Sequence, residues 1–217
     1  MVLKTLCMTA AGFISGSLLF SVWLARLKGR DPRAAEDHNP GALNAFRVGG
    51  WVVGVPAMLL DFVKAAVPVW AGRSVLGISG FWLVPVALAP VLGHAFSPFF
   101  RGRGGKAIAA TFGIWCGLTL WQGPAAFGAG LTLGWLALES DAWSVMLGMV
   151  GLLLYALLRQ GGLVLAAIWT GNVLVLAFKH RRELGRGIRP RPWLLPKPGP
   201  GTNGTGKAKD RASGSKT

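Results

Sequence analysis

Charged residues are scarce in this chain, and acidic ones are rarest. Asp, Glu, Lys and Arg make up 14% of the 217 residues, against about 25% in a typical soluble domain. Hydrophobic residues account for 52%, and apolar runs fill almost everything from Leu6 to Phe178. A soluble fold has no interior for so many runs, whereas a bilayer accommodates one spanning helix per roughly 20 residues. The composition therefore predicts an all-α polytopic membrane protein.

Cysteine is also scarce, with two residues in the whole chain. Cys7 and Cys116 lie far apart inside apolar runs, so they have neither metal-binding nor redox spacing. We expect them to behave as small hydrophobic side chains, and we predict no metal site and no cofactor. The first apolar segment lacks an A-x-A cleavage site, so we expect it to span the membrane.

Seven apolar segments are predicted to span the membrane, with six or eight as alternatives. Basic residues gather between Lys28 and Arg47, between Arg101 and Lys106, and from Lys179 onward. Positive charge is retained on the cytoplasmic side, and seven spans place all three groups there. We therefore predict a cell inner (plasma) membrane protein with a cytoplasmic C-terminus and an external N-terminus. The predicted spans are 6–27, 50–70, 76–93, 107–121, 124–138, 143–158 and 161–179.

The chain divides into a membrane domain, residues 1–187, and a basic, Pro/Gly-rich tail, residues 188–217. The tail has almost nothing apolar to bury, so we expect disorder beyond about residue 197. The formal net charge is +15. Because nearly half of the Lys and Arg residues lie in the tail and most of the rest in two short loops, this charge indicates membrane orientation, and we predict no nucleic-acid partner.

Four polar groups of residues interrupt the apolar chain. They are Gly29–Arg47, the pair Asp61 and Lys64, Gly93–Lys106, and His180–Glu183. Three of them fall at predicted cytoplasmic helix ends, and together they supply Lys, Arg, His and Asn with few carboxylates. This mixture favours binding of a polyanionic substrate that carries an acyl chain.

The sequence Gly104-Gly105-Lys106 has the clearest chemistry. Two glycines allow close backbone approach to a ligand, and a helix beginning near Ala107 would direct the positive end of its dipole to the same place. Lys106 and Arg103 add charges suited to phosphate. The alternative is a flexible loop that carries cytoplasmic positive charge.

The remaining polar residues leave two interpretations open. Asp61 and Lys64 are three residues apart, so they can pair on one helix face as a structural ion pair, or brace a helix beside a polar cavity. His94 and His180 are each either a ligand contact or an interfacial histidine. A transporter is a weaker hypothesis, because we find no inverted repeat.

Five stretches together resemble a known family, the bacterial acyl-phosphate-dependent glycerol-3-phosphate acyltransferases, or PlsY family. The resemblance covers roughly residues 12–187. In order, the stretches are Gly16-Ser17; Gly29-x-Asp31-x-Arg33 with Asn39-x-Gly41-Ala42-x-Asn44-x-x-Arg47; Leu60-Asp61-x-x-Lys64; Gly93-His94 with Gly104-Gly105-Lys106; and His180-Arg181.

The resemblance implies transfer of a fatty acyl group from acyl phosphate to glycerol 3-phosphate, giving lysophosphatidate for phospholipid biosynthesis. The partners expected from it are these two substrates and the lipid bilayer. The implied catalytic residues are Arg47 and Lys106, and Asp37 and His38 are candidate catalytic residues as alternatives to a phosphate oxygen of the donor for accepting the proton. The implied substrate-binding residues are Asn39, Asn44, His94, Gly104, Gly105, His180, Arg181 and Glu183.

This chain departs from the family pattern in the loops. Glu36-Asp37-His38 replaces Gly-Ser-Gly, Leu43 replaces threonine, Ala107 replaces glycine and Glu183 replaces asparagine. Acidic side chains in a phosphate site repel the substrate unless neighbours neutralise them. An alternative function is therefore a family-like scaffold with lost or altered chemistry that serves as a membrane binding or assembly protein.

Overall fold

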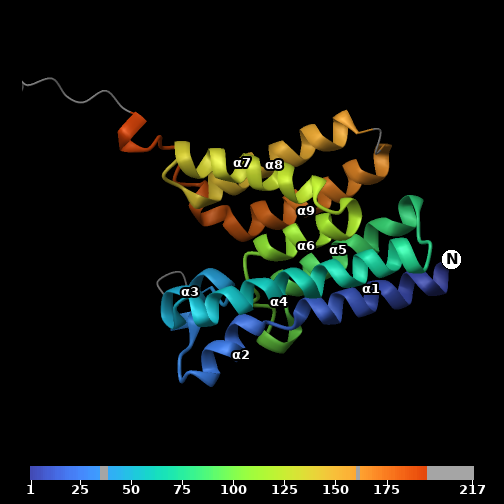
Figure 1. Cartoon of the computed structure of the whole chain (residues 1–217), viewed down its shortest axis with the longest axis horizontal. Helices are drawn as coiled ribbons and strands as arrows, with labels where there is room; N and C mark the ends of the chain where they lie inside the picture. The colour runs from blue at the N-terminus through green and yellow to red at the C-terminus, as the bar shows by residue number, and fades with distance from the viewer. Residues whose placement is uncertain (35–38, 160–161, 195–217) are drawn as a thin grey trace, which may run out of the picture.

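The computed structural model describes residues 1–34, 39–159 and 162–194, and within them the chain is helical (Figure 1). The predicted all-α class is confirmed. Short single turns join the α-helices, and one isolated bridge pairs Leu138 with Pro190. The described α-helices are α1 Val2–Ser17, α2 Phe20–Leu27, α3 Ala42–Gly49, α4 Trp51–Trp70, α5 Leu83–Ala95, α6 Ile108–Thr119, α7 Gln122–Ala137, α8 Asp141–Leu158 and α9 Gly162–Leu184.

Five helical segments of the described chain are long and apolar enough to cross a membrane. The shorter helices α6 and α7 have 12 and 16 residues, although each coincides with a predicted span. Seven crossings therefore remain a prediction, while a multi-pass membrane protein is established. The five segments are Val2–Leu27, Trp51–Val75, Gly80–Phe100, Asp141–Leu158 and Gly162–Leu184.

The first span is broken at Leu18 and Leu19, where we predicted one continuous helix. Lys64 of α4 donates a hydrogen bond to the carbonyl of Leu18. Gly16 lies so close to the backbone of Pro90 in α5 that a side chain there would collide with it. The break thus satisfies a buried ammonium, and the glycine allows the helices to touch.

Small residues let the helices pack closely. Gly113 and Gly117 of α6 face the backbone of α4, and Gly130 and Gly134 of α7 face that of α8. Each pair is four residues apart, the spacing that brings membrane helices together. Around these contacts lies a buried core that includes Val86, Ile114, Trp115, Phe127 and Leu176.

Three boundaries differ from the sequence prediction. Residues 42–49, interpreted as a loop, form α3. Helix α5 begins at Leu83 rather than near residue 76. Helix α9 continues to Leu184, so His180 and Arg181 lie within a helix and not after it. Most of the predicted tail lies outside the described residues.

Candidate functional site

The Gly104-Gly105 loop is held against the end of α5. The amide of Gly104 donates to the carbonyl of Ala95 (3.2 Å), and that of Gly105 donates to the carbonyl of His94 (3.0 Å). A side chain at Gly105 would collide with Nε2 of His94. We predicted that these glycines would allow close approach to a ligand. In this structure the close approach is to His94, and the two amides fix the loop.

Lys106, which follows this loop, contacts the end of α9. Its Nζ lies 2.5 Å from Oε1 of Glu183, and the two side chains are 22% and 28% exposed. Because Lys106 is 77 residues from Glu183 in the chain, the contact joins two of the four polar groups identified in the sequence. It also places a carboxylate against the ammonium that we predicted would bind phosphate.

Lys179 fixes the same loop from α9, and sequence reasoning did not select it. Its Nζ donates to the carbonyls of Ala95 and Gly104, each at 2.9 Å. The available signal was a lysine at the end of an apolar run, directly before His180 and Arg181. Such a lysine is also what orientation in the membrane requires, so the sequence did not distinguish the two roles.

His180 and Arg181 point to different surroundings. His180 is buried, and its Nδ1 lies 2.8 Å from the carbonyl of Leu176. Its Nε2 has no hydrogen-bond partner in the described part of the chain. Arg181 is exposed and folds back on α9, where it donates to the carbonyl of Phe178 (2.7 Å) and lies over the Phe178 ring (4.2 Å). His180 thus has a buried ring nitrogen that a ligand could contact.

Helix α3 organises the first polar loop. Asn44 is buried and donates from Nδ2 to the carbonyl of Asn39 (2.8 Å). Arg47, one turn later, donates from Nη1 to Oδ1 of Asn44 (3.2 Å). The structure therefore groups these three predicted site residues. Asp37 and His38 lie outside the described residues.

A buried polar cluster connects α4 to α5. Nζ of Lys64 lies 2.6 Å from Oδ1 of Asp61, so the predicted ion pair is confirmed. Nδ1 of His94 lies 3.8 Å from the same oxygen, and all three residues are at most 6% exposed. His94 is therefore buried, and its ring lies between the ion pair and Gly105.

Metal ligands are not grouped in the described segments, which contain no set of three His, Cys, Asp or Glu residues placed to hold an ion. What they do assemble is a polar group at one set of helix ends, formed by Lys106, Lys179, His180 and Glu183. Fold and site thus define a class: a helical integral membrane protein with a polar site where helix ends meet.

Comparison with known proteins gives the family. The sequence model of glycerol-3-phosphate acyltransferase matches residues 6–189, and the chain belongs to this family. It is 38% identical over 195 residues to glycerol-3-phosphate acyltransferase 1 of Thermotoga maritima, covering 82% of this chain and 94% of that one. It is 43% identical over 114 residues to the glycerol-3-phosphate acyltransferase of Actinobacillus succinogenes, covering 52% and 56%.

Solved structures agree with the sequence comparison. The fold is similar to crystal structures of PlsY (YgiH), an integral membrane glycerol 3-phosphate acyltransferase. The glycerol 3-phosphate form has a TM-score of 0.77 at 25% identity, covering 84% of this chain and 90% of that one. The lysophosphatidic acid form has a TM-score of 0.72 with the same coverage.

Proposed function

We propose that this protein transfers a fatty acyl group from acyl phosphate to the first hydroxyl of glycerol 3-phosphate. The hydroxyl oxygen attacks the acyl carbonyl carbon, the bond from that carbon to the phosphate oxygen breaks, and the products are lysophosphatidate and inorganic phosphate. The proton passes to an oxygen of the departing phosphate, with Asp37 and His38 as alternative acceptors. The reaction needs no covalent acyl-enzyme intermediate.

The contact between Lys106 and Glu183 carries the proposal. An ammonium that already holds a carboxylate oxygen at 2.5 Å is placed to hold a phosphate oxygen in the same way, because both are anionic acceptors of charge-assisted hydrogen bonds. Lys106 and Arg47 would bind phosphate and stabilise the charge that develops on the oxygens. Asn39, Asn44 and His180 would orient the acceptor.

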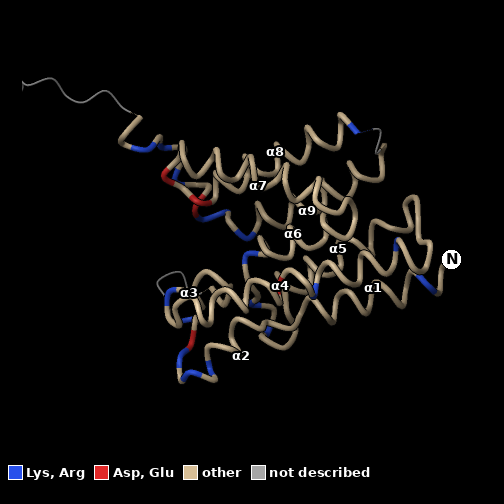
Figure 2. Tube along the Cα trace, in the orientation of Figure 1, with Lys and Arg blue, Asp and Glu red and all other residues tan. Residues whose placement is uncertain are grey.

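We also infer seven membrane crossings, with the site at the cytoplasmic face. Lys and Arg gather around α2, α3, the start of α6 and the end of α9 (Figure 2), and positive charge marks the cytoplasmic side. At the other ends of the helices, Gln122, the first residue of α7, accepts hydrogen bonds from Tyr155 (2.9 Å) and Arg159 (2.6 Å) at the end of α8. This contact supports crossings by both α6 and α7.

Phosphate release tests the activity directly. Detergent-purified protein would receive palmitoyl phosphate with and without glycerol 3-phosphate, beside a Lys106→Ala variant. Acceptor-dependent release of phosphate, together with lysophosphatidate formation, is expected for the native protein and not for the variant. Absence of both products from the folded native protein would contradict the proposal.

A scaffold with altered chemistry is the second candidate, favoured by the replacements at positions 36–38, 43 and 183. If these replacements removed activity, the triple variant Asp37→Ser, His38→Gly, Glu183→Asn should gain acceptor-dependent phosphate release over an inactive native protein. If the native protein is active, the scaffold hypothesis is wrong, and the triple variant is not needed to decide it.

A further inference from the structure

Lys179 joins the two backbone segments that flank the turn between α5 and α6. Its Nζ donates hydrogen bonds of 2.9 Å to the carbonyl of Ala95, at the end of α5, and to the carbonyl of Gly104. The carbonyl of Ala95 also accepts the Gly104 amide at 3.2 Å. One side chain of α9 therefore closes the loop that leaves α5 and returns at Gly104, just before Lys106.

The surroundings of the Lys179 ammonium strengthen these two bonds. The centroid of the Phe96 ring lies 5.6 Å from Nζ, and the Phe178 ring packs against Phe96 with centroids 5.7 Å apart. Hydrogen bonds from a charged donor are stronger than neutral ones, and partial shielding from water strengthens them further. An ammonium has three N–H donors, and the protein's own backbone accepts from two of them.

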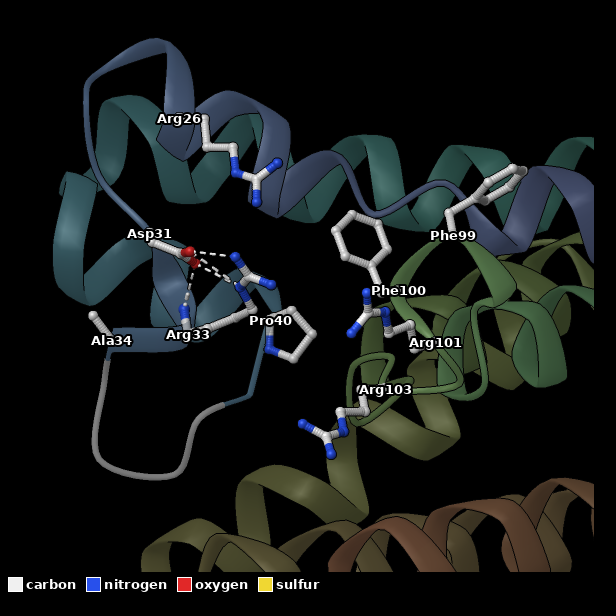
Figure 3. Close-up of a pocket in the computed structure, with 9 residues that line it drawn as sticks. All are labelled: Arg26, Asp31, Arg33, Ala34, Pro40, Phe99, Phe100, Arg101 and Arg103. Atoms are coloured by element: carbon white, nitrogen blue, oxygen red, sulfur yellow. Dashed lines mark hydrogen bonds and ion pairs between the residues drawn. The ribbon is translucent and has the colours of Figure 1, made fainter.

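The Gly104-Gly105 segment packs closely against the end of α5. A side chain at Gly104 would collide with the carbonyl of His94, and a side chain at Gly105 would collide with the His94 ring. By contrast, the side chain of Arg103, directly before these glycines, extends into the cavity beside the first polar loop (Figure 3). The two glycines therefore keep a fixed place beside α5, and a displacement of Gly104 would also move Lys106.

One face of α9 holds both the backbone and the side chain of this segment. Lys179 binds the carbonyl of Gly104, and Glu183 binds the ammonium of Lys106. Residues four apart in a helix lie one above the other, so Lys179 and Glu183 form a continuous edge of α9. The position of Lys106 relative to α9 is thus set at two points.

We propose that Lys179 is a positioning residue for acyl transfer. By fixing the carbonyl of Gly104, it holds the Lys106 ammonium where the substrate phosphate is to be bound, without contacting the substrate itself. The inference rests on the proposed function, and it adds a residue that acts through Lys106. A misplacement of about 1 Å in a catalytic site can lower the rate roughly 100-fold, so two hydrogen bonds that fix this loop would have a large effect on turnover.

Hydrogen–deuterium exchange tests whether Lys179 holds the loop, and it needs no substrate. In the full chain in nanodiscs, Lys179→Met should raise the exchange rate of the Gly104 and Gly105 amides roughly tenfold, because the donor that fixes the loop is lost. Lys179→Gln, a second variant with a shorter and uncharged side chain, should change the rate in the same direction. Arg189→Met removes an exposed cation beyond the same end of α9, and this matched control should exchange like the native protein.

Initial-rate kinetics with palmitoyl phosphate and glycerol 3-phosphate test the effect on the reaction, at equal amounts of folded protein. Lys179→Met should lower kcat/KM roughly 100-fold. We expect kcat to fall as well as KM to rise, because Lys106 is proposed to act on phosphate in both the bound state and the transition state. Lys179→Arg keeps a charged donor for both carbonyls and should recover a large part of the loss, and Arg189→Met should have native kinetics.

Together the two measurements separate the outcomes. A lower kcat/KM with unchanged exchange of the loop would overturn the proposal in favour of direct contact between Lys179 and substrate. Faster exchange with native kinetics would also overturn it, because the loop would then not determine the rate. An inactive native protein would overturn the proposed function and this inference together, whereas exchange would still show whether Lys179 holds the loop.

Discussion

Ala107 adopts a left-handed backbone, with φ 61° and ψ 18°, at the position where α6 begins. It is buried among the core residues, and the family pattern has glycine at this position. The Cβ of an L-residue is crowded in this conformation, at a cost of roughly 1–2 kcal/mol. The loop that carries Lys106 into α6 thus requires a backbone that alanine adopts poorly.

Replacing Ala107 by glycine should therefore stabilise the protein. We expect Ala107→Gly to raise the free energy of unfolding by about 1 kcal/mol, because glycine adopts φ > 0 without a steric penalty. Thermal unfolding in detergent measures the effect. Ala125→Gly, in the regular helix α7, is the matched control and should lower stability by about 1 kcal/mol. A change in the free energy of unfolding that has the same sign in both variants would contradict this explanation.

Glu183 is the other informative single residue, because its carboxylate lies against the Lys106 ammonium. If Lys106 binds the substrate phosphate as proposed, that phosphate has to displace this carboxylate, and Glu183 competes for the cation. The ion pair is only partly buried, which limits its strength to about 1 kcal/mol.

If the proposed activity holds, Glu183→Gln should lower the KM for glycerol 3-phosphate roughly fivefold, the ratio that about 1 kcal/mol gives. Initial-rate kinetics measure it. Glu139→Gln, which removes an exposed carboxylate between α7 and α8, should leave KM unchanged. A fall in kcat without a change in KM would show that the carboxylate takes part in the reaction and does not compete with substrate.

At the scale of the element, α4 and α5 are joined by the buried cluster of Asp61, Lys64 and His94. An ion pair inside a bilayer is costly unless its charges remain paired. Here the ammonium also donates to the carbonyl freed by the break between α1 and α2. The pair therefore connects three helical segments.

Removing one charge of the Asp61–Lys64 pair should destabilise the protein more than removing both charges. Lys64→Met leaves Asp61 alone in the core, and we expect a loss of about 3–5 kcal/mol in the free energy of unfolding. The double variant Asp61→Asn/Lys64→Met should recover a large part of that loss, because no unpaired charge remains. Unfolding by denaturant in mixed micelles compares the two. A double variant less stable than the single would contradict the account.

The membrane-spanning segments were predictable because each is an apolar run, whereas α3 was not, and the helix ends depend on distant contacts. The break at Leu18 depends on Lys64, 46 residues away. Likewise, the role of Lys179 depends on a loop 75 residues earlier. Lys106 was predicted from its motif, but its contact with Glu183 was not, since no local pattern indicates how α6 meets α9.

For the whole molecule, the number of crossings is decided at the turn between α6 and α7. Five and seven spans both leave the termini on opposite sides, so the termini do not discriminate. Trp121, 71% exposed in this turn, lies outside with seven spans and inside with five.

Trp121→Cys, in a chain whose Cys7 and Cys116 are alanine, should react with a membrane-impermeant maleimide in intact cells. Arg186→Cys, after α9, should react only after permeabilisation, and Arg73→Cys, after α4, should react in intact cells. Labelling is measured as the shift in the apparent mass of the protein on a gel. Protection of position 121 until permeabilisation, with position 73 reactive, would establish five crossings.

The shortness of α6 has a consequence for how the protein would meet its substrates. Twelve residues rise about 18 Å, whereas the hydrocarbon layer is about 30 Å thick, so a crossing α6 would begin below the membrane surface. A water-soluble acceptor would descend to Lys106, while a fatty product would leave sideways into the leaflet. The acceptor would then arrive by diffusion through water, whereas the product would leave by lateral diffusion in the leaflet. Lipid crowding within the membrane plane would therefore govern the rate of product release.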